Sequence, residues 1–136
     1  MMELIILLSI IEGLATDLHY NASGPSFYGM HLMADRVREP IHGFIDSIIE
    51  VAFLGNGLAA PSAKAISERT ATRLPALGTD APTLIKAIDS ALATTIAHIT
   101  KTNDKLPIGE QNLVGGIAES LQQSRGFIHR SLLPTP

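Results

Sequence analysis

The sequence predicts an all-α protein that folds as a four-helix bundle, with a short extra helix in a long crossover between the second and third helices. The chain has 136 residues, which suits one domain with a modest core, so residues 1–136 are expected to form a single domain. Apolar residues recur with a helical period over four long segments, and no strand pattern or internal repeat interrupts them. A hydrophobic content of 46% with 17% charged residues argues against disorder.

The first helix is expected over residues 2–20, and residues 1–15 of the chain are strongly apolar. A secretory signal peptide needs a basic start, but Glu3 stands there instead. A transmembrane span needs about 20 apolar residues, and Glu12 and Asp17 interrupt this segment. We therefore expect a core helix that is buried nearly all round, in a soluble, cytoplasmic protein without a membrane partner.

The second helix is expected over residues 25–54, where apolar positions again follow a helical period. Pro40 lies in its interior and predicts a kink, because proline removes one backbone hydrogen bond. The sequence Gly55-Asn56-Gly57 ends the helix. A long connection follows over residues 55–79, and its segment 61–69 has the composition of a short helix.

The third helix is expected from Asp80, a favourable N-cap, with Pro82 in its first turn, and it continues to about residue 103. The fourth is expected over residues 108–133, after a break that contains Pro107. Four long helices joined by two short turns and one long crossover between the second and third form the ferritin-like arrangement.

Acidic and imidazole side chains form one stripe along the second helix, because about 100° of rotation per residue places them on a common face opposite the apolar residues. Most charge stripes are solvated helix faces, and that interpretation stays open here. However, the stripe contains no lysine, and clustered like charges cost free energy unless a cation neutralises them. The alternative is a metal site. The stripe consists of His31, Asp35, Glu39, His42, Asp46 and Glu50.

The distance along the helix constrains any such site. A rise of about 1.5 Å per residue separates His31 from Asp46 by roughly 22 Å, whereas metal ligands lie about 2 Å from the ion. One chain therefore cannot bring both ends of the stripe to one metal. A second copy packed antiparallel about a two-fold axis near residues 40–42 would do so twice per dimer. His19, at the end of the first helix, is placed to fold back beside His31.

Residues 19–35, together with Asp46 and Glu50, resemble the signature of the Dps family, the ferritin-like mini-ferritins that protect DNA in starved bacteria. That signature is His-aromatic-Asn, then Gly-Pro-x-Phe, then His with Asp four residues later, and finally Asp-x-x-x-Glu. All five ligand positions match in residue type and spacing. The resemblance implies that one subunit supplies His19, His31 and Asp35, and that its two-fold partner supplies Asp46 and Glu50.

The resemblance also implies ferroxidase activity. Family members oxidise Fe(II), generally with hydrogen peroxide, store the ferric iron in a hollow shell of twelve subunits, and so limit oxidative damage. Carboxylate and imidazole ligands suit iron. The sequence departs from the family at Tyr20 and over residues 122–127, where the family usually carries tryptophan. Asp89, Asp104 and Glu110 are candidates for an acidic iron-entry pore, with ordinary surface carboxylates as the simpler interpretation.

Two alternatives belong to other classes of protein. One is a DNA-binding or structural shell with a secondary metal site, but the net charge of −3, the lack of a basic block and a start directly at the first helix argue against DNA binding. The other is a di-iron bundle oxidoreductase, suggested by Glu39 and His42. That architecture needs a second Glu-x-x-His pair, and Glu119 is followed three residues later by Gln122 instead.

Overall fold

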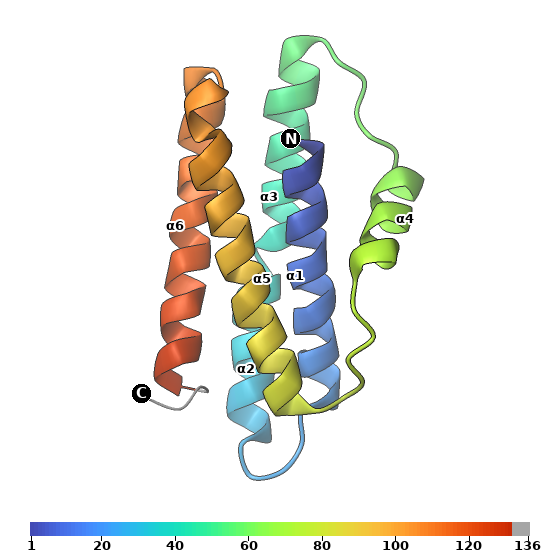
Figure 1. Cartoon of the computed structure of the whole chain (residues 1–136), viewed down its shortest axis with the longest axis vertical. Coiled ribbons are helices and arrows are strands. Elements are labelled where there is room, and N and C mark those ends of the chain that lie inside the picture. Colours follow the sequence, from blue (N-terminus) through green and yellow to red (C-terminus); the bar gives the residue numbers. More distant parts are fainter. Residues whose placement is uncertain (132–136) are drawn as a thin grey trace.

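A computed structural model describes residues 1–131 and shows an all-helical bundle, as predicted. Four long helical segments run side by side, and the short helix α4 stands outside them next to α1 (Figure 1). The long crossover joins the second segment to the third, which confirms the ferritin-like connectivity. The long segments are α1 (Met2–Asn21), α2 (Phe27–Arg38) continued by α3 (Ile41–Ile48), α5 (Ala81–Thr102) and α6 (Ile108–Ser131).

Helix α1 lies at the centre of the packing, in contact with α2, α3, α4 and α5. Because α1 has neighbours on several sides, its apolar residues do not form a narrow stripe along one face of the helix. The prediction that this helix is buried nearly all round is confirmed. The buried residues of α1 are Leu4, Ile5, Ile6, Leu7, Leu8, Ile11, Leu14, Ala15, Leu18 and His19.

The second long segment is interrupted, so the expectation of one continuous helix over residues 25–54 is wrong in its middle. Helix α2 ends at Arg38 and α3 begins at Ile41, with Glu39 and Pro40 in a turn between them. The cause is Pro40, which has no N–H to donate. The chain nevertheless keeps its direction, because Glu39 and Pro40 both retain helical backbone angles, with φ −55° and ψ −43° at Glu39 and φ −75° and ψ −14° at Pro40.

The far end of this segment also departs from an α-helix. After α3 the chain forms a π-helical turn (Ile49–Phe53) and then a 3-10 turn (Leu54–Asn56). Gly57 follows with φ +71°, a left-handed conformation that glycine adopts without steric cost. The predicted end of the helix at the Gly-Asn-Gly sequence is confirmed, whereas the sequence pattern did not predict the π turn.

The crossover is attached to α1 through α4 (Ala63–Arg73). The Ser62 side chain caps α4 by accepting a hydrogen bond from the Ala65 N–H at 3.0 Å. At the other end, Arg73 donates to the Glu3 carboxylate at 2.7 Å. A side chain at Gly13 of α1 would meet Leu74 at 3.1 Å, so glycine allows the end of the crossover to approach α1 closely.

The last two helices agree with the prediction. Asp80 caps α5 by accepting a hydrogen bond from the Thr83 N–H at 3.1 Å. Helix α6 begins at Ile108 as expected and is described to Ser131, so the last two residues of the predicted helix lie outside the described range. Within residues 1–131, no helix is both long enough and apolar enough to cross a membrane.

We expect Leu92→Ala to lower the free energy of unfolding by about 2–5 kcal/mol, because Leu92 is fully buried in α5 and its removal leaves a cavity. Thr94→Ala, at an exposed position of the same helix, is the control and should change it by less than about 0.5 kcal/mol. Urea unfolding at one fixed protein concentration measures both. Equal effects of the two substitutions would contradict the described core.

Candidate metal centre

Three of the five predicted ligands lie together where α1 ends and α2 begins. The His19 ring is buried and stacks on the His31 ring, with 3.7 Å between ring centroids and 21° between ring planes. The Nδ1 atom of His19 lies 3.4 Å from Oδ1 of Asp35, one turn further along α2. The tight turn between the helices, with Gly24 at φ +86°, brings the end of α1 back beside α2.

The two histidines hold each other through reciprocal hydrogen bonds. Nδ1 of His19 lies 3.1 Å from the His31 carbonyl oxygen, and Nδ1 of His31 lies 2.7 Å from the His19 carbonyl oxygen. A carbonyl oxygen can only accept, so each Nδ1 carries the proton. In the neutral form of each ring, Nε2 therefore carries the lone pair, which is the form in which imidazole binds a metal.

Asp35 is half-buried and ionised. Nε of Arg38 donates to its Oδ1 at 2.8 Å. This hydrogen bond holds the pKa of Asp35 below its usual value, and it outweighs the effect of partial burial, which acts in the opposite direction. The same hydrogen bond raises the pKa of Arg38. The cluster therefore presents one carboxylate beside two imidazoles whose Nδ1 atoms are already hydrogen-bonded.

The other two predicted ligands, Asp46 and Glu50, are exposed on the far half of the same helical segment. Asp46 lies on α3 and Glu50 lies in the π turn. Within residues 1–131, no group of three or more His, Cys, Asp or Glu side chains is close enough to hold a metal ion. The chain by itself therefore presents two incomplete sets of ligands, His19–His31–Asp35 and Asp46–Glu50.

Two of the candidate pore carboxylates have partners within the chain. Asp89 of α5 accepts hydrogen bonds from Nε of Arg125 at 2.8 Å and from Nε2 of His129 at 2.9 Å. Burial raises the pKa of Asp89, but these hydrogen bonds outweigh it and leave the pKa below its usual value. Glu110 is buried at the start of α6 and accepts from the Asn56 amide at 3.2 Å. Both carboxylates thus serve contacts between helices.

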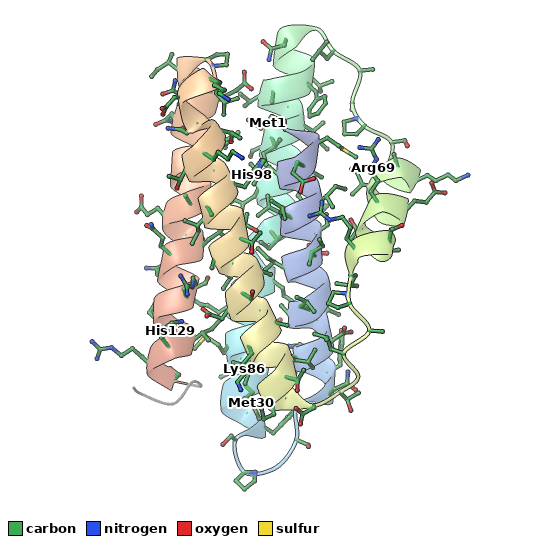
Figure 2. All side chains as sticks on the ribbon, viewed as in Figure 1. Met1, Met30, Arg69, Lys86, His98 and His129 are labelled. Atoms are coloured by element: carbon green, nitrogen blue, oxygen red, sulfur yellow. The ribbon has the colours of Figure 1, made fainter. Side chains whose placement is uncertain are left out.

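The remaining polar residues of interest are dispersed. Glu39 and His42 are exposed near the break at Pro40, and Asp104 is exposed after α5. His98 of α5 lies toward the end of the bundle that holds Met1, and His129 lies near the end of α6 (Figure 2). Burial lowers the pKa of His98. Neither His98 nor His129 joins the two ligand sets.

Sequence reasoning missed Arg38, which contacts both helices of the cluster. Its Nη1 lies 3.4 Å from the Thr16 hydroxyl of α1, and its guanidinium carbon lies 5.4 Å from the centroid of the Tyr20 ring. The one available signal was the spacing of three residues between Asp35 and Arg38, which places an opposite charge on the same helix face.

The fold is similar to that of a solved structure, the tetragonal form of Dps from Mycobacterium smegmatis. The TM-score is 0.76, with 23% sequence identity, and the alignment covers 97% of this chain and 84% of that chain. No protein-family model matches the sequence, and no curated protein matches it significantly. The likeness establishes a Dps-like fold for this chain.

We expect the neutral forms of His19 and His31 to carry the proton on Nδ1, because each Nδ1 donates to the other residue's carbonyl oxygen. Long-range ¹H–¹⁵N NMR spectra of the imidazole rings measure this tautomer directly. His42, which is exposed, provides the comparison within the same sample. Protonated Nε2 atoms at His19 and His31 would contradict the described pair.

Proposed function

We propose that this protein is a Dps-like ferroxidase that oxidises Fe(II), with hydrogen peroxide as oxidant, at metal sites shared between two subunits. The observation that carries the proposal is the cluster of His19, His31 and Asp35, whose Nδ1 atoms are used internally while both Nε2 atoms remain available. Two imidazoles and one carboxylate form half of a suitable iron site. Asp46 and Glu50 of a second copy would form the other half.

The positions of the two ligand sets support an antiparallel pair of chains. Along the sequence, His31 and Glu50 are equidistant from the Pro40–Ile41 bond, and so are Asp35 and Asp46. A two-fold axis at the break between α2 and α3 therefore places each set of ligands opposite the other. The same operation would form both sites at once.

Exposed apolar side chains on this segment are spaced about nearly the same midpoint as the ligands, and this is a separate observation. Tyr28 and Leu32 are 69% and 48% exposed on α2, and Val51 and Leu54 are 41% and 56% exposed at the other end of the segment. Tyr28 and Leu54 are equidistant from Ile41, and the midpoint of Leu32 and Val51 falls next to it. An antiparallel second copy would cover each apolar side chain with another, which favours association.

The ligands fit the proposed chemistry. Carboxylates hold iron in both oxidation states, and the developing ferric charge is stabilised by three of them per complete site. Hydrogen peroxide accepts two electrons, so two Fe(II) ions are oxidised as one peroxide is reduced to water. The ferric product would be stored inside a shell of twelve subunits, which would remove both reactants of a damaging radical reaction from the cell.

A di-iron bundle enzyme is less well supported. Such a site is built from ligands of one chain, and residues 1–131 contain no group of three His, Cys, Asp or Glu side chains that are close enough. Glu39 and His42 lie exposed beside the break at Pro40. They are better placed to lie near the proposed two-fold axis than to bind a metal within the chain.

We expect His31→Ala combined with Asp35→Ala to abolish peroxide-dependent Fe(II) oxidation, because the variant lacks two of the five ligands. The ferric product is followed by its absorbance after Fe(II) is added anaerobically and peroxide is injected. Helix content and oligomeric size should not change. The control is His98→Ala combined with Asp104→Ala, which removes the same two residue types elsewhere. Normal oxidation by the first variant would refute the proposed site.

We expect two inactive variants to restore activity when they share a dimer. One variant lacks His31 and Asp35, and the other lacks Asp46 and Glu50. A mixed dimer has one site with all ligands and one site with none of those four. Random reassembly of an equimolar mixture should therefore recover about a quarter of the wild-type sites, measured as the initial rate of Fe(II) oxidation. A site contained within one chain would recover no activity after mixing.

A further inference from the structure

Arg38, the last residue of α2, is held against α1 by contacts on several sides. Its side chain is 23% exposed, and its Nε donates to Oδ1 of Asp35 at 2.8 Å. Its Nη1 contacts the Thr16 hydroxyl at 3.4 Å, and its guanidinium lies near the face of Tyr20. An arginine on the next turn of α2 is therefore anchored to α1, the helix that also supplies His19.

These contacts divide the roles of the two oxygens of Asp35. Oδ1 accepts from Arg38 and lies 3.4 Å from Nδ1 of His19. Among the hydrogen bonds within residues 1–131, none joins a donor to Oδ2, although the Glu39 side chain lies near enough to help lower the pKa of Asp35. The carboxylate is thus fixed by one oxygen, and the other oxygen has its lone pairs free. A carboxylate oriented in this way is ready to bind a metal through Oδ2.

We propose that Arg38 is a positioning residue that orients the Asp35 carboxylate for metal binding, a role that rests on the proposed function of the site. Arg38 does not contact the metal or the oxidant in this role. It acts through Asp35, whose carboxylate would keep the 3.4 Å contact with Nδ1 of His19 but lose its 2.8 Å hydrogen bond without Arg38. Hydrogen-bonding partners of metal ligands typically contribute about 10- to 100-fold to metal affinity.

The geometry favours orientation over a simple effect of charge. A positive charge beside Asp35 opposes the binding of a cation, so charge alone would make Arg38 unfavourable for the site. The orienting effect of the planar guanidinium offsets this unfavourable charge. Its Nε contacts Asp35 and its Nη1 contacts Thr16, and the angle between these two groups is fixed. A lysine ammonium has the same charge but cannot make both contacts in this geometry. Arg38→Lys therefore separates orientation from charge.

The test is titration of the full-length, assembled protein with Co(II) alone, followed by the visible absorption of the bound ion. We expect Arg38→Met and Arg38→Lys each to weaken Co(II) binding about 10-fold or more and to change the intensity of the bands. Arg36→Met is the matched control, because Arg36 is an exposed arginine of the same helix that packs on Phe127 instead. It should bind Co(II) like the wild type.

Two further variants keep the test decisive. Thr16→Val removes an anchor of Arg38 without changing any charge, and we expect a smaller loss of affinity in the same direction even where an Arg38 variant fails to fold. In an Asp35→Ala background, Arg38→Met should cause no additional loss, because the residue acts through Asp35.

The outcomes distinguish this proposal from the proposed function. Co(II) binding by the wild type with equal or tighter binding by Arg38→Met, or unchanged binding by Arg38→Lys, would overturn the role of Arg38 alone. An additive loss in the Asp35→Ala background would also overturn it. A wild-type protein that binds no Co(II) would overturn the proposed metal site and the role of Arg38 with it.

Discussion

The burial of α1 is the constraint on which the site depends. Helix α1 contacts four other helices, so its position and its last turn are fixed by the hydrophobic core. That turn carries His19, which is buried like its neighbour Leu18. A buried imidazole needs a hydrogen-bond partner, and the carbonyl oxygen of His31 is the one that α2 provides. Packing of the core thus determines which ring nitrogen is free.

The elements that the sequence predicted well are those with a local cause. Asp80 caps its helix through a contact that spans three residues, and Gly57 ends the second segment because its conformation favours glycine. Pro40 predicted a kink in one helix, and the structure instead has a break between two helices, α2 and α3, at this proline. Each of these signals can be recognised in a few neighbouring residues.

Features that depend on tertiary packing were not predictable in the same way. The π turn over Ile49–Phe53 shifts the hydrogen bonds by one residue without a proline or glycine inside it. The reciprocal bonds between His19 and His31 join residues twelve positions apart, and ring orientation has no sequence signal. Spacing placed four of the five candidate ligands on two halves of the second segment, whereas only the structure could show that Arg38 already contacts Asp35.

The two ligand sets differ in charge, and this difference couples metal binding to assembly. In the set formed by His19, His31 and Asp35, the single carboxylate is balanced by Arg38. Asp46 and Glu50 are exposed and solvated in one chain, so their charges cost little. In the proposed dimer they would lie beside Asp35 with less water around them, and their repulsion would oppose association. A divalent cation removes that repulsion, so Fe(II) binding and pairing of the chains would stabilise each other.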